Sequence, residues 1–177
     1  MKNNKKGFTL IELLAVIVIL GVIMGIAIPA MTGYIDNSKK DSMVDSASQI
    51  LSAAVQKVTA NNQLPIPGKY TYVKLAGVEL SQGGTSPYSN AAYDPSSMIR
   101  IYNNAGKYEY TIYLTDATSG SLNCLTATEA QVNGSTETKR ELIKNAICSA
   151  SVTTNCCNAI STSATFDANN IAYNAAS

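Results

Sequence analysis

The chain has no histidine among its 177 residues. This absence excludes every Ser-His-Asp and Cys-His arrangement and every zinc site that uses histidine. A glycine-rich phosphate-binding loop is missing as well, so an ATPase would have to be a separate chain. We therefore expect a protein that is not an enzyme and that uses neither a cofactor nor a metal.

The chain also lacks a large excess of charge of either sign, since it has 13 basic and 12 acidic side chains. An imbalance this small does not provide the basic surface that nucleic-acid binding needs. Lys2, Lys5 and Lys6 lie in the first six residues, and the rest of the chain has 10 basic and 12 acidic groups. We expect no nucleic-acid partner.

A long hydrophobic run is present from Leu13 to Met31, 19 residues without a charge. As a helix it would span ~28 Å, close to the thickness of a bilayer's hydrocarbon core. The three lysines precede the run, and no equally dense basic cluster follows it. The positive-inside rule then predicts a single-pass segment with its N-terminus in the cytoplasm and the rest of the chain outside.

Glu12 lies at the entrance to this run, and three interpretations treat it differently. A secretory signal cleaved near Ala27–Ala30 would have an overlong apolar core. A plain membrane anchor leaves the carboxylate unexplained, at a cost of about 2.5 to 3.5 kcal/mol within a membrane helix. Cleavage between Gly7 and Phe8 would instead create an α-amino group four residues before Glu12, on the same helical face.

The segment Lys5–Leu14, KKGFTLIELL, resembles the processing site of type IV prepilins and the related pseudopilins. The resemblance implies that a prepilin peptidase cuts after Gly7 and methylates the Phe8 amine. It also implies that Glu12 of one subunit neutralises the Phe8 amine of a neighbour, so Glu12 and Thr9 are the predicted filament-assembly residues. The resemblance covers roughly Met1 to Ala60.

A type IV pilin implies a particular set of partners. These are other copies of itself and related pilins in a helical filament, the prepilin peptidase, the assembly platform protein and its ATPase. The subunit would lie in the cytoplasmic membrane before assembly and afterwards in a surface pilus supporting adhesion, motility or attachment. Two alternatives stay open: a pseudopilin of a type II secretion or competence machine, and a membrane-anchored binding module that never polymerises.

Gly21, Gly25 and Pro29 are spaced four residues apart within the apolar run. The two glycines favour close helix packing in lipid. Glycine and proline also ease bending or unwinding, and the resemblance implies flexibility here during filament assembly. A merely kinked membrane helix is the alternative.

After Met31 the apolar residues become a stripe at steps of three and four, which predicts an amphipathic helix. The stripe consists of Met43, Val44, Ala47, Ile50, Leu51, Ala54, Val55 and Val58. This helix should end near Asn61–Asn62, because Pro65 and Pro67 cannot continue it. The expected organisation is a leader over residues 1–7, a spine helix over 8–61 with its membrane part at about 8–33, and a head over 62–177.

The head is predicted to contain an antiparallel sheet. Residues 62–97 are rich in proline and glycine and indicate mostly loop, with a short strand or helical turn in Tyr70–Leu80. Met98–Tyr102 and Lys107–Leu114 alternate around a turn as a hairpin does. One face of this hairpin should cover the amphipathic helix, which gives an α+β fold with a helical spine against an antiparallel sheet.

The last third of the chain gives weaker signals. Thr126 with Glu129, and Ser135 with Glu137, predict two short helices separated by Asn133-Gly134. The tail, residues 160–173, is compatible with a last edge strand. Ten tyrosines are present, eight of them within residues 70–113. We expect them to pack in cross-strand pairs rather than to form a sticky surface.

All four cysteines, Cys124, Cys148, Cys156 and Cys157, fall on the side that the topology places outside. An even count in an exported domain favours disulfides, and four cysteines permit three pairings. A bridge between adjacent cysteines is strained, so we expect Cys156 and Cys157 to reach separately to the other two. A four-cysteine metal site is the rival, although adjacent cysteines make awkward tetrahedral ligands.

Overall fold

The computed structural model describes residues 7–80, 84–117, 122, 124–146 and 164–175, with the side chain of Asn174 excepted. The chain divides into two compact units, Met1–Ser38 and Lys39–Ser177. One long helix, α1 (Leu10–Ala60), contributes to both.

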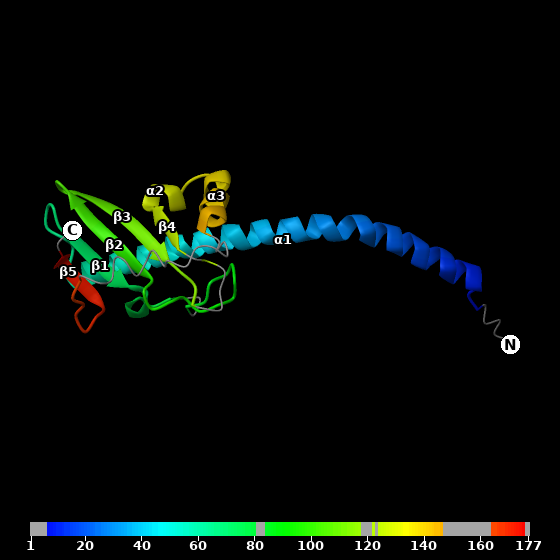
Figure 1. Ribbon diagram of the computed structural model, residues 1–177, viewed down its shortest axis with the longest axis horizontal. Helices are drawn as coiled ribbons and strands as arrows, with labels where there is room; N and C mark the ends of the chain where they lie inside the picture. Colours follow the sequence, from blue (N-terminus) through cyan, green and yellow to red (C-terminus); the bar gives the residue numbers. More distant parts are fainter. Residues whose placement is uncertain (1–6, 81–83, 118–121, 123, 147–163, 176–177) are drawn as a thin grey trace, which may run out of the picture. The chain divides into compact units, whose positions relative to one another are not determined.

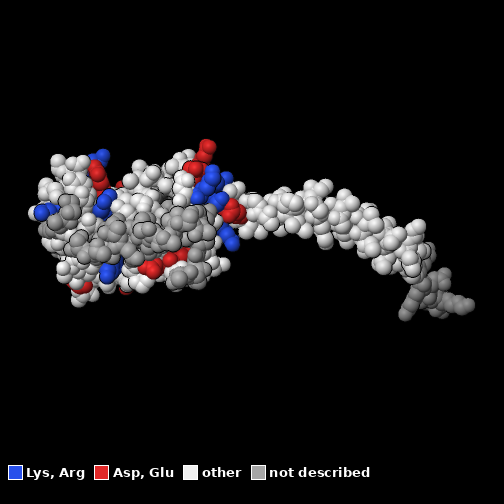
Figure 2. Space-filling model, viewed as in Figure 1, with Lys and Arg blue, Asp and Glu red and all other residues white. Residues whose placement is uncertain are grey.

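In the first unit, the large apolar side chains of α1 from Leu10 to Ile35 are all exposed. The face of this segment seen in Figure 2 carries uncharged side chains. Leucine, isoleucine and valine dominate it, and no proline interrupts it before Pro29. A helix that is apolar all round has no water-facing side, so it requires an apolar environment.

In the second unit, the rest of α1 is amphipathic as predicted. Its buried apolar residues are Met43, Val44, Ala47, Ile50, Leu51, Ala54 and Val58, and Val55 is partly buried. They share one face because helical residues three and four apart are neighbours. This face forms one wall of the head's core.

The helix ends at Ala60, close to the predicted position. Asn62 adopts a left-handed conformation with φ 53°, and the Gln63 amide returns a hydrogen bond to the Val58 carbonyl at 2.9 Å. Asparagine tolerates this conformation better than most residues and so favours a helix end. Pro65 follows shortly afterwards.

Five antiparallel strands form one sheet in the order β4-β3-β2-β1-β5. The strands are β1 (Tyr70–Lys74), β2 (Met98–Asn104), β3 (Lys107–Leu114), β4 (Leu125–Thr128) and β5 (Ile171–Ala175). A short 3-10 helix, η1 (Leu75–Gly77), follows β1. Figure 1 shows strands β1 to β3 running beside the cyan part of α1. The predicted α+β class is confirmed.

The main core lies between the sheet and the second half of α1, and a smaller buried cluster of Tyr72, Met98, Tyr113 and Ala172 lies on the other face of the sheet. Strand residues that alternate toward the helix are fully or almost fully buried, and they include Val73, Ile99, Ile101, Ile112 and Leu114. Alternate residues such as Arg100 and Tyr102 therefore lie on the opposite face of the sheet. We call this opposite face the outer face.

The β2–β3 hairpin is tighter than the sequence suggested. Strand β2 continues to Asn104, so only Ala105 and Gly106 form the loop, and both have positive φ (49° and 96°). Two left-handed residues define the hairpin turn that matches the twist of the strands. The Gly106 amide donates to Asn103 Oδ1 at 2.7 Å, which closes the turn.

Two helices follow β4, namely α2 (Glu129–Val132) and α3 (Thr136–Ala146). The prediction of two helices separated by Asn133-Gly134 is confirmed, but the predicted cap Thr126 was wrong. Thr126 belongs to β4, and Thr128 caps α2 reciprocally with Gln131. Leu125 and Ala127 are buried against the core, which keeps this segment in the sheet.

The described end of the chain adds β5 to the edge of the sheet beside β1. A turn held by Asp167 leads into it, with the amides of Asn169 and Ile171 each donating to Asp167 Oδ1 at 2.9 Å. Gln63 Nε2 donates to Asp167 Oδ2 at 2.9 Å, which ties the turn to the chain just after α1. The expected edge strand is therefore present as Ile171–Ala175, at the end of the predicted range, whereas residues 160–163 of that range lie outside the described residues.

Candidate functional site

The predicted cleavage point lies in irregular backbone just before α1. Gly7, Phe8 and Thr9 precede the helix, which begins at Leu10. Phe8 is 92% exposed, and no atom lies within 4 Å of the place where a Cβ on Gly7 would stand. Exposed, non-helical backbone is the kind of segment that proteases cut. The position is open to an enzyme, and cleavage itself stays a prediction.

Glu12 and Thr9 bind each other across the first turn of α1. The Thr9 amide donates to Glu12 Oε2 at 2.7 Å, and the Thr9 hydroxyl donates to the same oxygen at 2.9 Å. The Glu12 amide donates in return to Thr9 Oγ1 at 3.3 Å. This reciprocal pattern is a capping box, which satisfies amides that the start of a helix otherwise leaves without partners.

The capping box was missed in the sequence, although its signal, Thr-x-x-Glu before an apolar run, was present. It gives Glu12 a partner inside its own subunit, before any cleavage. The argument from membrane cost assumed that the Glu12 carboxylate has no partner in a plain anchor. The capping box shows that it has one. Glu12 also lies in the first turn, where the helix dipole favours a negative charge.

Within the described residues, α1 is the helix that is long and apolar enough to cross a membrane, judged by length and composition. None of its most apolar stretch is buried in the protein. Exposed apolar surface of this extent is typical of segments that meet lipid or other protein chains.

Gly21, Gly25 and Pro29 all lie inside α1, which continues through them without a break. Proline has no amide hydrogen, so the Gly25 carbonyl lacks the usual helical donor four residues on. One turn further on, the Thr32 hydroxyl donates to a different carbonyl, that of Pro29, at 2.9 Å. Open space surrounds the places where Cβ atoms would stand on both glycines. The predicted flexibility is untested by this arrangement and stays a prediction.

Cys124 immediately precedes β4, at an edge of the sheet, and it is disulfide-bonded. Cys148, Cys156 and Cys157 lie outside the described residues. The expected pairing therefore stays a prediction. Within the described ranges, no group of three histidine, cysteine, aspartate or glutamate residues is placed to hold a metal ion.

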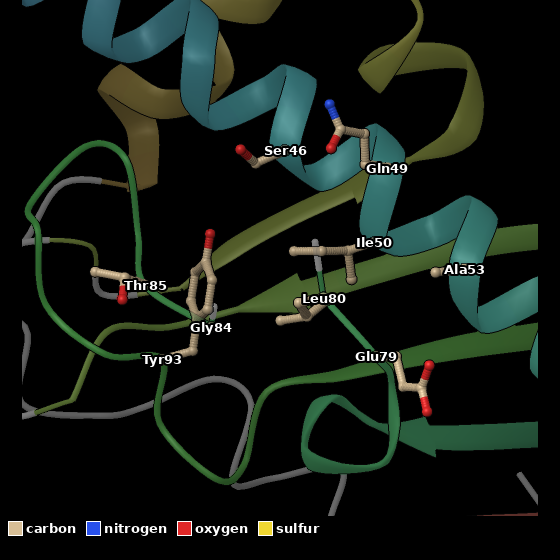
Figure 3. A pocket seen from close by; sticks show the side chains of 9 residues that line it. All are labelled: Ser46, Gln49, Ile50, Ala53, Glu79, Leu80, Gly84, Thr85 and Tyr93. Carbon is tan, nitrogen blue, oxygen red and sulfur yellow. The ribbon is translucent and has the colours of Figure 1, made fainter. Parts of the chain in front are cut away.

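A small cavity of about 100 Å³ lies in the head between α1 and the residues Glu79, Leu80, Gly84, Thr85 and Tyr93. Figure 3 shows Ile50 and Leu80 close to the Tyr93 ring, with Glu79 at the edge. Burial, together with the charge of Asp116, raises the pKa of Tyr93. Sites for drug-sized ligands usually measure ~300 to 1,000 Å³, so this cavity is too small to serve as one.

The described residues thus combine an exposed apolar helix, with a capped acidic residue in its first turn, and an α+β head. The prokaryotic N-terminal methylation motif matches residues 2–28. This segment includes the predicted cleavage point, the capping box and most of the apolar run. The resemblance to type IV pilins is therefore confirmed.

Three similar proteins agree with the motif. The chain is 42% identical over 53 residues to the type IV major fimbrial protein FimA of Dichelobacter nodosus, which covers 30% of this chain and 34% of that protein. It is 34% identical over 90 residues to the type IV major alpha-pilin of Moraxella bovis, covering 50% and 56%. It is 50% identical over 88 residues to fimbrial protein Q of Moraxella bovis, covering 50% and 55%.

The chain thus spans between about a third and somewhat over half of the length of these relatives. All three are named as fimbrial proteins or pilins, which is consistent with a chain that is not an enzyme. No solved structure matches the chain.

Proposed function

We propose that the chain is a structural subunit of a type IV pilus, processed after Gly7 and assembled through its apolar N-terminal helix. The observation that carries this proposal is the exposed apolar first half of α1, directly after the exposed, non-helical segment at Gly7 and Phe8. The matching methylation motif over residues 2–28 supports it. The domains proposed are a leader (1–7), a spine (8–61) and a head (62–177).

Before assembly, the apolar helix would hold the subunit in the cytoplasmic membrane with its N-terminus inside. A carboxylate at the edge of a bilayer is costly when its oxygens lack donors. The capping box supplies two donors to Glu12 Oε2, which lowers the cost of holding this acidic residue at the membrane before assembly.

In the filament, like helices would bury their apolar surfaces against one another, and pairing of charges would select the register. Both donors from Thr9 use Glu12 Oε2. Because an ionised carboxylate offers about four acceptor positions, Oε1 can accept from the methylated Phe8 amine of a neighbour while the cap persists. The cap and the intersubunit pair are therefore compatible.

The other predicted features fit the same function. Gly21, Gly25 and Pro29 would allow the helix to bend or unwind as subunits pack. Disulfides among Cys124, Cys148, Cys156 and Cys157 would stabilise the exported head. The peptidase, platform protein and ATPase would be the partners that process and extrude the subunit.

The test is N-terminal sequencing and intact mass of the subunit recovered from fibres sheared off the cell surface. The expected result is a chain that starts at N-methylated Phe8. Fibres that contain residues 1–7 would contradict processing. Absence of this chain from surface fibres, with processed chain in the membrane, would favour the pseudopilin alternative.

Substitutions at Glu12 separate the cap from the charge pair. Glu12→Gln keeps an acceptor for the Thr9 amide, because glutamine also completes a capping box, but it removes the charge. Glu12→Ala removes both. If pairing selects the register, both variants are processed and both assemble poorly. Normal piliation of Glu12→Gln, with loss in Glu12→Ala, would show that the cap alone matters.

A further inference from the structure

Arg100 lies in the middle of the sheet on its outer face. It is in register with Tyr72 on β1 and with Thr111 on β3. Its guanidinium carbon lies 5.6 Å from the centroid of the Tyr70 ring and 5.5 Å from that of the Tyr113 ring. Distances within about 6 Å allow cation–π attraction, so two rings hold this cation.

The guanidinium of Arg100 uses little of its hydrogen-bonding capacity within the protein. Its one hydrogen bond in the described part of the chain runs from Nη2 to Thr111 Oγ1 at 3.4 Å. A guanidinium carries five N–H donors. Every aspartate and glutamate of the chain falls within the described residues. None of them forms an ion pair with Arg100 there.

Arg100 has no ion pair with any aspartate or glutamate, and two rings fix it, so it is preorganised to bind an anion. Guanidinium geometry favours bidentate contact with a planar carboxylate, and the rings restrict the freedom that binding would otherwise have to remove. Arg100 is partly exposed, so an anion from solution reaches it.

Aromatic side chains surround this cation on the same face. The Tyr70 ring stacks on Tyr102 with centroids 4.6 Å apart, and both residues are partly exposed. The negative faces of such rings attract weakly positive C–H groups, which line the faces of sugar rings. Tyr113, only 6% exposed, forms a floor beside them.

A second cation, Lys74, lies two residues after Tyr72 on the same face, and its Nζ is 4.5 Å from the centre of the Phe166 ring. The one acidic residue nearby in register, Glu109 opposite Tyr102, accepts a hydrogen bond from Asn104 Nδ2 at 2.9 Å. Lys107, opposite Asn104, is a third cation on this face, and three separate cations do not make the long basic track that a nucleic acid requires. A ligand with few carboxylates and apolar ring faces fits better.

We propose that Arg100, with Tyr70, Tyr102 and Tyr113, binds a carboxylate-bearing polysaccharide on the outer face of the sheet. The guanidinium pairs with the carboxylate of a uronic-acid unit, and the partly exposed Tyr102 ring packs against a sugar face. This goes beyond a filament role, because it concerns the head of each single subunit and does not depend on polymerisation.

The test measures binding of the full-length chain, in detergent micelles, to polygalacturonate. The matched control ligand is fully methyl-esterified polygalacturonate, which keeps the sugar rings and loses the charge. Arg100→Gln should weaken binding at least about tenfold, as expected from losing one charge-assisted hydrogen-bonded pair. Lys107→Gln removes the same charge from an exposed position on the same outer face, four residues along β3 from Thr111, and should leave binding unchanged if the ring-held Arg100 is the site.

Several results would overturn the proposal. They are no binding by the unaltered chain, equal binding of the methyl ester, or equal loss in Lys107→Gln and Arg100→Gln. Displacement of the polymer by inorganic phosphate at equal charge concentration would show a site for any anion and would also contradict it. If Arg100→Gln fails to fold, Arg100→Lys tests the proposal in its place. This variant keeps the positive charge but loses the planar guanidinium, so it should still bind the polymer more weakly than the unaltered chain.

Discussion

Arg140 on α3 holds Asp41 on α1 with two parallel hydrogen bonds, Nε to Oδ1 at 3.0 Å and Nη2 to Oδ2 at 2.7 Å. One residue earlier, Lys139 donates to Asp45 Oδ1 at 2.9 Å. Figure 2 shows basic and acidic side chains side by side in this region. All four residues lie in the second compact unit, Lys39–Ser177. The two pairs therefore join α3 to the part of α1 that belongs to the head.

The Arg140–Asp41 pair should make the head sensitive to acid. The hydrogen bond from Arg140 lowers the pKa of Asp41 below its usual value. A carboxyl group with a depressed folded pKa stabilises the protein above its unfolded pKa of about 3.9, and this contribution is lost as the pH falls through the folded pKa. Asp41→Asn should therefore lower the melting temperature at neutral pH and flatten its fall below about pH 4.

The measurement is thermal unfolding of the full chain at a series of pH values. Because surface pairs are weak, the difference at neutral pH should not exceed about 3 °C. Glu79→Gln is the control, an exposed carboxylate outside this cluster, and it should follow the unaltered chain. Parallel pH curves for Asp41→Asn and the unaltered chain would contradict the role of the pair.

Tyr93 should make the head sensitive to alkali. Burial and then the charge of Asp116 raise the pKa of Tyr93 above its usual value of about 10. A raised folded pKa gives stability that is complete below the unfolded pKa and is lost as the pH rises beyond it. Above about pH 10 the unaltered chain should therefore lose stability faster than Tyr93→Phe.

The Tyr93→Phe variant keeps the ring and removes only the hydroxyl, whose bond to Met43 Sδ is long at 3.5 Å. Tyr173→Phe, at an exposed tyrosine, is the matched control and should retain the alkaline slope. Urea unfolding at pH 8 and at about pH 11 compares the three chains. An identical alkaline slope in Tyr93→Phe and the unaltered chain would exclude this tyrosine as the cause.

The hairpin turn at Ala105 and Gly106 offers a stabilising substitution. Ala105 has φ 49°, a conformation that costs an ordinary residue about 1 kcal/mol and that asparagine adopts more easily. Asn-Gly is also the preferred pair for this two-residue turn. Ala105→Asn should raise the free energy of unfolding by about 0.5 to 1 kcal/mol.

Ala105→Val tests the same cause in the opposite direction. A β-branched side chain is strained at positive φ, so this variant should be less stable than the unaltered chain. Both free energies come from urea titrations fitted with a common slope. The explanation by backbone strain does not hold if valine and asparagine change the stability equally.

Much of the fold was predictable because its signals are local. The three- and four-residue spacing of Met43 to Val58 identified the helix face, and the alternation in Met98–Leu114 identified the hairpin. Strand β4 was not predicted, because Leu125–Thr128 is only four residues long and forms a strand through pairing with β3. Thr126 and Thr128 are equally plausible caps until that pairing places Leu125 and Ala127 in the core.

The candidate sites also differ in whether they depend on local spacing or on long-range strand pairing. The capping box of Thr9 and Glu12 depends on residues three apart and was readable from the sequence, although it was missed. The Arg100 cluster was not readable, since Tyr70 and Tyr113 reach its two sides only through the register of three strands. Long-range pairing of this kind is set by turns and by burial across the sheet, which local spacing does not specify.

Gly77 provides a test of how the last strand is held in place. A Cβ at this position would lie 2.7 Å from the Asn169 carbonyl oxygen and 2.8 Å from Asn170 Cβ, in the turn that leads into β5. Lys57 Nζ also donates to the Gly77 carbonyl, which ties η1 to α1. Gly77→Ala should force the turn away and cost about 1 to 3 kcal/mol of stability, as overpacking does. Gly33→Ala is the control, because open space surrounds that position.

The effect of Gly77→Ala should be concentrated at β5, which among the described strands pairs only with β1, at the edge of the sheet. Amide hydrogen exchange resolves this, because local opening exposes some amides well before global unfolding. The amides of Ile171 and Ala172 should exchange faster in Gly77→Ala, while that of Ile101 in central β2 should change much less. Equal acceleration at Ile101 and Ile171 would mean that the substitution weakens the whole head, and that the turn does not hold β5 separately.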